Sequence, residues 1–268
     1  MANYFQVEVV PDLVDGDISY LIADDKTDTP FASRDILFKW TEVDIPSGTN
    51  LLRSVQAHVM GEDGGTAALG YWHLLFAKSI DGDAPDALGS TNSAATTAYD
   101  LPRKIVGAVT LGSTTVPYGM LNGIAYGTYF TPGGQLGSDA NENNTLGGNI
   151  DLPIVLDLEP GSGTNVGYDK LYVAALTSTA FDFSTGIEST GAIVAEATAT
   201  IAVDGVDPRK CFQIGDSVYV HDLDTAAGTV KSMTSGTIVL NAVTAVAVAN
   251  NDEIMNGNPI RVKLGFEG

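Results

Sequence analysis

Two carboxylates in the middle of the chain have the spacing that acid–base chemistry requires. Asp157 and Glu159 lie in and just after an apolar stretch, Leu152–Leu158, that is followed by Pro160 and Gly161. Alternation along a strand places both side chains on one side, as in the carboxylate pairs that cleave glycosidic bonds. The same residues also fit an ordinary apolar strand that ends in a turn with two solvated carboxylates. The pair therefore defines one enzymatic hypothesis, a hydrolase.

Other nucleophiles and metal ligands are sparse. The histidines His58, His73 and His221 are far apart and match no metal-binding spacing, so we expect no zinc site. His58 and His73 occur in strand-like stretches, which predicts surface or half-buried structural histidines. The single cysteine, Cys211, has no imidazole partner in the sequence and is predicted to be a buried structural thiol. We therefore expect no cofactor.

Two long polar stretches, residues 81–100 and 131–149, are predicted to be loops, and loops of this length are usually functional or disordered. Both contain the oxygen ligands that calcium prefers, although neither has the residue order of an EF-hand. The candidate ligands are Asp81, Asp83 and Asp86 in the first loop, and Asp139, Asn141, Glu142 and Asn143 in the second. Solvated acidic loops explain the same residues, so the sequence leaves calcium binding open.

Aromatic residues gather in the glycine-rich stretch Thr115–Phe130: Tyr118, Tyr126, Tyr129 and Phe130. If they were exposed, these rings could stack on a sugar. A pair of strands packed in the core, with glycines at bulges, also explains them and is the interpretation that we favour.

Apolar residues recur with a period of two over much of the chain, which predicts β-strands. The alternating sets are Val55, Ala57 and Val59; Trp72, Leu74 and Phe76; and Ile260, Val262, Leu264 and Phe266. The last set has the regular alternation of a half-buried strand. Only Ala192–Thr200 and Ala242–Ala249 are candidates for helices, and both could equally be strands.

Many short strands separated by Gly, Pro and Asp turns predict an all-β protein. We expect residues 1–190 to form an antiparallel β-sandwich, jelly-roll-like, with the long loops 81–100 and 131–149. Residues 191–268 are expected to form a small SH3-like β-barrel. The acidity is concentrated in the first part, which has a net charge of −16 from 24 acidic and 8 basic residues, against −4 from 9 and 5 in the second.

Charge and composition exclude several classes of partner. The net charge of −20 and the scattered basic residues argue against binding to nucleic acid or to an anionic membrane surface. One cysteine permits no disulfide within the chain, and the N-terminus has neither the basic nor the apolar region of a signal peptide. We expect a protein made in a cytoplasm that can still end up outside a cell as part of a particle.

A succession of short apolar strands and Gly-Asp or Asn-Asn turns runs through the C-terminal stretch. The segments are Phe212–Val220, Gly228–Val230, Gly236–Leu240 and Ala249–Ile254. Their order resembles the small β-barrel modules of tailed-phage virion proteins, including capsid decoration proteins. The resemblance implies a compact barrel with a structural role in a virion. The first 190 residues match no decoration family motif by motif.

We therefore expect a non-enzymatic virion structural protein, a capsid decoration or cement protein that is made in a host cytoplasm and lies on the capsid surface. Its expected partners are the major capsid protein and further copies of itself, with a trimer favoured. The candidate partner-binding residues form an extended N-terminal segment that would act as an added strand: Ala2, Asn3, Tyr4, Phe5, Gln6 and Val7.

Three alternatives stay open. The first is a carbohydrate- or receptor-binding tail or surface module, with Tyr118, Tyr126 and Tyr129 as glycan contacts. The second is a hydrolase, since Asp157 and Glu159 resemble the strand-end Asp-x-Glu of lysozyme-type glycoside hydrolases. Those enzymes are β/α barrels with an acidic first strand, and this sequence predicts neither feature. The third is a capsid shell protein with a jelly roll as its main element.

Overall fold

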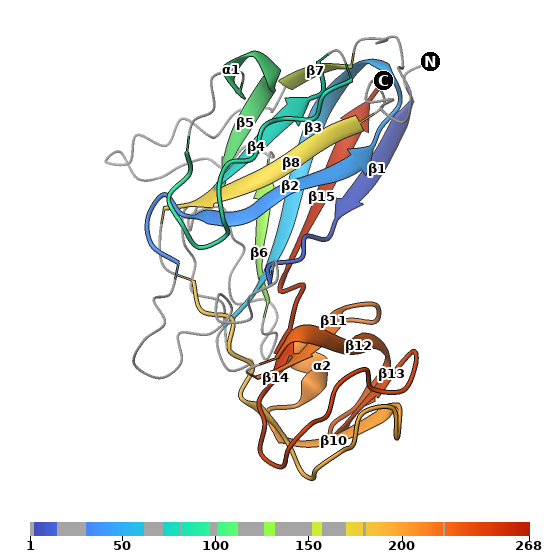
Figure 1. The fold of residues 1–268 in the computed structure, drawn as a ribbon. Helices are drawn as coiled ribbons and strands as arrows, with labels where there is room; N and C mark the ends of the chain where they lie inside the picture. Colours follow the sequence, from blue (N-terminus) through green and yellow to red (C-terminus); the bar gives the residue numbers. More distant parts are fainter. Residues whose placement is uncertain are drawn as a thin grey trace, which may run out of the picture.

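The computed structural model describes residues 3–14, 31–61, 72–80, 82–96, 101–111, 126–131, 152–156, 170–178, 181–221 and 223–268. Nearly all regular structure in these ranges is antiparallel β-strand, which confirms the all-β class. Figure 1 shows two lobes, a larger one that holds both chain termini and a smaller one at the opposite end.

The larger lobe is a sandwich of two sheets. The first sheet has the strand order β1 (Tyr4–Val9), β15 (Ile260–Glu267), β3 (Gly48–Met60) and β6 (Tyr126–Thr131), and β7 (Leu152–Leu156) also pairs with β3. The second sheet has the order β2 (Ile36–Asp44), β8 (Lys170–Thr177), β4 (Trp72–Lys78) and β5 (Ile105–Leu111). Every paired strand in both sheets is antiparallel to its neighbour.

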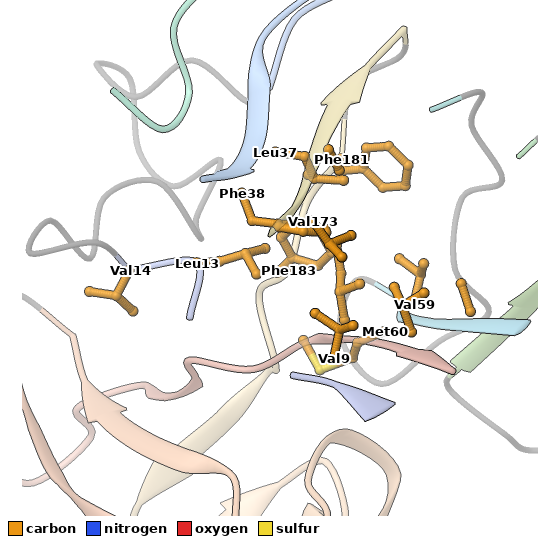
Figure 2. Close-up of a cluster of buried hydrophobic side chains, with 14 of the residues drawn as sticks. Val9, Leu13, Val14, Leu37, Phe38, Val59, Met60, Val173, Phe181 and Phe183 are labelled. Atoms are coloured by element: carbon orange, nitrogen blue, oxygen red, sulfur yellow. The ribbon is translucent and has the colours of Figure 1, made fainter. Parts of the chain in front are cut away.

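The core lies between the two sheets, and the predicted alternation fills it. The apolar positions predicted for β3, β4 and β15 are all buried. At the end of the sandwich nearest the small lobe, the segments that follow β1 and β8 add buried side chains to the core. Figure 2 shows Leu13 and Phe183 from these segments beside Phe38 and Val173 of the second sheet. The sandwich is thereby closed at this end by apolar packing.

A structured loop covers part of the outer face of the second sheet. Residues 82–96, within the stretch predicted as a long loop, run along the start of β2, where the Ile36 N–H donates to the Ser93 carbonyl at 2.9 Å. Leu88 from this loop packs with Ile36 and Ala174 in a second apolar cluster. In this part the predicted loop is thus a fixed cover, whereas residues 132–149 of the other predicted loop lie outside the described residues.

The smaller lobe is one six-stranded sheet that curls into a half-barrel. Its strands, in sheet order, are β14 (Ile254–Asn256), β11 (Ser217–Val220), β12 (Leu223–Thr234), β13 (Thr237–Leu240), β10 (Thr200–Gly205) and β9 (Ile187–Ser189). Ser235 and Gly236 form the tight turn between β12 and β13, where Thr234 pairs with Thr237. The segments that carry the resemblance to virion modules thus contribute β11 to β14.

Helices are almost absent from the described residues. They are α1 (Leu101–Lys104) and α2 (Pro208–Cys211), and neither was predicted. The sequence does carry a signal for α2, because Asp207 caps its first turn and Pro208 occupies the first helical position. The two helix candidates are wrong as helices: Ala192–Thr200 and Ala242–Ala249 instead hydrogen-bond to each other as an irregular antiparallel ribbon.

The last strand crosses the boundary that the sequence predicted. Residues 191–268 were expected to form one barrel, but β15 pairs with β1 and β3 in the first sheet. At the other end, β9 precedes residue 191 and pairs with β10 in the small lobe. The half-barrel therefore spans Ile187–Asn256, and the chain returns to the sandwich because Ile260, Val262, Leu264 and Phe266 bury their side chains in its core.

Candidate interaction surface

Strand β1 forms one edge of the first sheet, at the margin of the larger lobe (Figure 1). Among the described residues, β15 is the one strand that pairs with it. Toward the core, Val9 is buried and Phe5 stacks on Phe266, with ring centroids 5.2 Å apart and an interplanar angle of 17°. On the opposite face, Tyr4 is 73% exposed and Gln6 is also exposed. The strand is therefore anchored by alternate residues and open along its outer edge.

The outward backbone groups of this edge can be assigned from its hydrogen bonds. Asn3 and Gly268 exchange both backbone hydrogen bonds, with N–O distances of 3.1 and 2.9 Å. In an antiparallel pair of strands, residue pairs that exchange two hydrogen bonds alternate with pairs that exchange none. Counting from Asn3, the odd-numbered residues of β1 are therefore the ones hydrogen-bonded to β15. The N–H and C=O groups of the even-numbered residues point away from β15: Tyr4, Gln6 and Glu8. No described residue is hydrogen-bonded to these groups.

The predicted partner-binding segment lies on this edge. Ala2 is outside the described residues, Asn3 directly precedes β1, and Tyr4, Phe5, Gln6 and Val7 are in the strand. The sequence predicted this segment as an added strand for a partner, and in the structure it is already paired with β15 of its own chain. Partner binding by these residues stays a prediction. What is available is the outer edge, which can receive a strand from a partner.

Charges beside this edge are balanced locally, in contrast to the net charge of −20 of the whole chain. Glu8 lies 3.8 Å from the guanidinium of Arg261 and 4.0 Å from the ammonium of Lys263. At the other end of β15, Arg53 contacts Glu267, with N–O distances of 2.5 and 2.6 Å. A partner that approaches β1 therefore meets paired charges.

A buried polar network joins the half-barrel to the start of β15. Asp216, which is fully buried, pairs with Arg261 and also accepts hydrogen bonds from the Gln213 N–H at 2.7 Å and from Asn256 Nδ2 at 3.0 Å. Burial raises the pKa of Asp216, whereas the hydrogen bonds from Gln213 and Asn256 and the positive charge of Arg261 lower it. Asn258 accepts from the Ser217 N–H at 2.8 Å. The network fixes the two lobes to each other.

A second set of contacts at this junction comes from the segment that follows β1. The Leu13 N–H donates to the Gly257 carbonyl at 3.0 Å, and Asn258 Nδ2 donates to the Pro11 carbonyl at 2.9 Å. The Tyr219 hydroxyl lies 3.3 Å from an Asp12 carboxylate oxygen, and burial together with that carboxylate raises the pKa of Tyr219 to about 12. The segment after β1 is thus held by the half-barrel, which keeps the whole edge strand in place.

His73 is the centre of a polar cluster on the second sheet. Its Nδ1 lies 2.8 Å from Thr110 Oγ1 and its Nε2 lies 2.9 Å from Ser178 Oγ. This resembles a nucleophile, a base and an orienting group, but the third member is a neutral hydroxyl and not a carboxylate that could stabilise an imidazolium. Burial lowers the pKa of His73, which keeps the ring neutral near pH 7. The cluster is best explained as a tie between β4, β5 and the end of β8.

The remaining histidines and the cysteine also have structural surroundings. His58 Nε2 lies 3.0 Å from Gln56 Nε2. The pKa of His58 is lowered mainly by burial and, second, by the positive charge of the nearby Lys263. The prediction that His58 and His73 are at the surface or half-buried is confirmed, since both are half-buried. Cys211 is a buried free thiol, as predicted, with its sulfur 3.7 Å from the Thr185 carbonyl oxygen. These groups suggest no reaction.

Several predicted sites fall on residues that the structure does not describe. They are the carboxylate pair Asp157 and Glu159, the second candidate calcium loop, Asp81 of the first, and Tyr118. Tyr126 and Tyr129 are in β6, but their side chains are outside the described part. Asp83 and Asp86 are exposed. Within the ranges given above, no group of three or more His, Cys, Asp or Glu side chains is arranged to hold a metal ion.

Comparison with protein families and with curated proteins finds no match to this chain. No helix in the described ranges is both long and apolar enough to span a bilayer. The open edge of β1 is therefore the feature of the described residues that most directly suggests a function.

Proposed function

We propose that this chain is a virion structural protein, a decoration or cement protein that binds to the outside of a tailed-phage capsid shell. Its partners are the major capsid protein and further copies of the chain. Its work is adhesion and not catalysis. On the shell, the trimer that the sequence favours would suit a local three-fold axis of a capsid.

The observation that carries this proposal is the open edge of β1. Its outward N–H and C=O groups have no hydrogen-bond partner among the described residues. A row of such donors and acceptors can hold an extended segment of another protein by strand addition. Backbone pairing of this kind suits an acidic protein, since it requires no complementary charge. The edge strand is paired with β15 in the first sheet, so a bound strand meets a preformed surface.

Two further features support the same proposal. The segments that resemble virion modules coincide with strands β11 to β14 of a compact half-barrel. The net charge of −20 keeps the free protein soluble until it meets many repeated sites, where weak contacts combine.

A sedimentation experiment tests the proposal. Expanded capsid shells without accessory proteins are mixed with the folded chain, pelleted, and the bound copies are counted per shell. Saturable binding in a fixed ratio to the shell subunit is expected. If the chain stays folded and remains in the supernatant at all concentrations, the proposal is wrong.

Two controls separate decoration from the alternatives. Shells that stay closed without the chain contradict the shell-protein alternative, because a shell protein cannot be removed without loss of the particle. Binding to a glycan array with no binding to shells would favour the carbohydrate-binding module.

A further inference from the structure

We propose that the open edge of β1 pairs with β1 of a second copy of this chain, antiparallel about a two-fold axis, so that two first sheets become one continuous sheet. The outward groups of this edge belong to Tyr4, Gln6 and Glu8. A strand added to this edge must place its own outward-facing residues opposite them. In a second copy these are the same three positions, so the edge is complementary to itself. This inference concerns the isolated protein. Because one edge pairs with one strand at a time, the dimer must dissociate before β1 receives a segment of a shell.

One register satisfies all of the outward groups on both strands. Gln6 lies opposite Gln6 of the second copy, and Tyr4 lies opposite Glu8. If one strand is shifted by two residues in either direction, one of the three outward-facing residues of each copy no longer lies opposite an outward-facing residue of the other β1. The axis passes beside Gln6, which gives the isologous contact of a symmetric dimer. This geometry predicts a dimer, where the sequence favoured a trimer.

The charges permit this pairing despite the net charge of −20 on each copy. Glu8 is the one ionised side chain of β1, and in this register it faces Tyr4 and not a second carboxylate. Each Glu8 also has Arg261 and Lys263 of its own chain within 4.0 Å. Like charges directly opposite each other, which destabilise a strand pair, are therefore avoided.

The apolar residues of the edge are also complementary. Phe5 and Val7 face the core but are only half-buried. In the proposed register Phe5 lies opposite Val7, so pairing covers both and removes apolar surface from water. Among the features that usually prevent edge pairing, β1 has no proline, no lysine and no bulge in its register with β15.

A pair of cysteine variants tests the register residue by residue. In Gln6→Cys the two sulfurs lie across a bonded pair with Cα atoms about 5.5 Å apart, which is within the range of a disulfide. Tyr4→Cys is the matched control, because the two copies of position 4 are offset by four residues, about 14 Å along the strand. The native Cys211 is buried and adds no reactive thiol.

Under mild oxidation, Gln6→Cys is expected to form a covalent dimer at least about tenfold faster than Tyr4→Cys, because pairing gives a high local thiol concentration. Light scattering of the unmodified chain is expected to give twice 27.9 kDa. The dimer is expected to tighten as salt is added, since salt screens the repulsion between two acidic copies. Equal cross-linking of the two variants, or a monomer at all concentrations and salt levels, overturns the inference.

A proline variant tests the edge by a second route. Gln6→Pro removes an N–H that points away from β15, a position where an edge strand tolerates proline. We expect a monomer whose thermal midpoint equals that of the parent at dilutions where the parent is also monomeric, while the control Gln6→Thr stays dimeric. A Gln6→Pro dimer of unchanged affinity overturns the inference, and if this variant fails to fold the cysteine pair decides. A monomer that binds shells contradicts this inference alone, and a dimer that never binds shells contradicts the proposed function alone.

Discussion

The junction between the lobes and the open edge of β1 lie near each other, on the paired strands β1 and β15. They differ in whether their polar groups have hydrogen-bond partners. At the junction, the buried Asp216 accepts three hydrogen bonds, and its ion pair with Arg261 connects the half-barrel to β15. At the edge, the outward groups of β1 have no partner in the described residues. The difference suggests that the first set maintains the fold and that the second is available to another chain.

Removing the cation at the junction is expected to have the largest effect. Arg261→Ala leaves Asp216 buried without its ion pair, which should lower the free energy of unfolding by about 3–5 kcal/mol at pH 7. Urea unfolding measures this loss. The loss should be smaller near pH 4, where a carboxyl with a raised pKa can be protonated and buried at lower cost.

The control for this prediction is Lys263→Ala, two residues further along β15. Lys263 is partly exposed and lies 4.0 Å from Glu8, so its loss should change stability by less than about 1 kcal/mol. If the two alanine variants were equally stable, Arg261 would not be the residue that holds the lobes together.

A glycine at the junction provides the next prediction. A Cβ added at Gly257 would lie 2.5 Å from the ring of Tyr219, which is itself buried. Gly257→Ala should therefore destabilise the protein by about 1–3 kcal/mol in thermal or urea unfolding. Gly191→Ala is the matched control, because nothing lies within 4 Å of its added Cβ. Similar losses in both variants would show that close packing at the junction is not the cause.

The two neighbouring aromatic residues of β1, Tyr4 and Phe5, are expected to differ in how much they contribute to stability. Phe5→Ala removes a ring that stacks on Phe266 and should lower the free energy of unfolding by about 1–2 kcal/mol. Tyr4→Ala removes an exposed ring and should change it by less than about 0.5 kcal/mol. Urea unfolding of the two variants measures this difference. A large loss of stability in Tyr4→Ala would contradict the open edge.

The smallest effect concerns pH and His73. Its pKa is lowered in the folded state, so the unfolded chain takes up the proton first as the pH falls below 6.5. This contribution to stability is present above pH 6.5 and is lost on acidification. Measuring the free energy of unfolding of His73→Gln and of the parent at pH 8 and pH 5 isolates the contribution of His73. Both proteins share the change in stability that comes from approaching the pI. The parent should lose more stability than the variant, and equal losses would contradict the account.

Strands were predictable where one face is buried along their whole length. The alternation in β3, β4 and β15 identified their buried positions, and the all-β class followed from it. The pairing of β15 with β1 was not predictable, because the two strands lie at opposite ends of the chain and alternation does not specify a partner. The boundary at residue 190 was wrong for this reason.

The candidate surface was predictable in its residues but not in its geometry. The sequence indicated Ala2 to Val7 as an extended partner-binding segment, and the described part of it is an edge strand. Which backbone groups face outward depends on the bonded pair of Asn3 and Gly268, which no local pattern indicates. At the junction, Gly215 and Asp216 were interpreted as a turn. The burial of Asp216 depends on Arg261, which is remote in the sequence.

Amide hydrogen exchange along β1 tests the central claim most directly. In dilute protein, the outward amides of Tyr4, Gln6 and Glu8 should exchange much faster than the amides of the intervening residues, which are bonded to β15. In the associated protein all six residues of the strand should be protected. Outward amides that are already protected in the monomer, or that still exchange rapidly after association, would contradict the claim that β1 is the interaction edge.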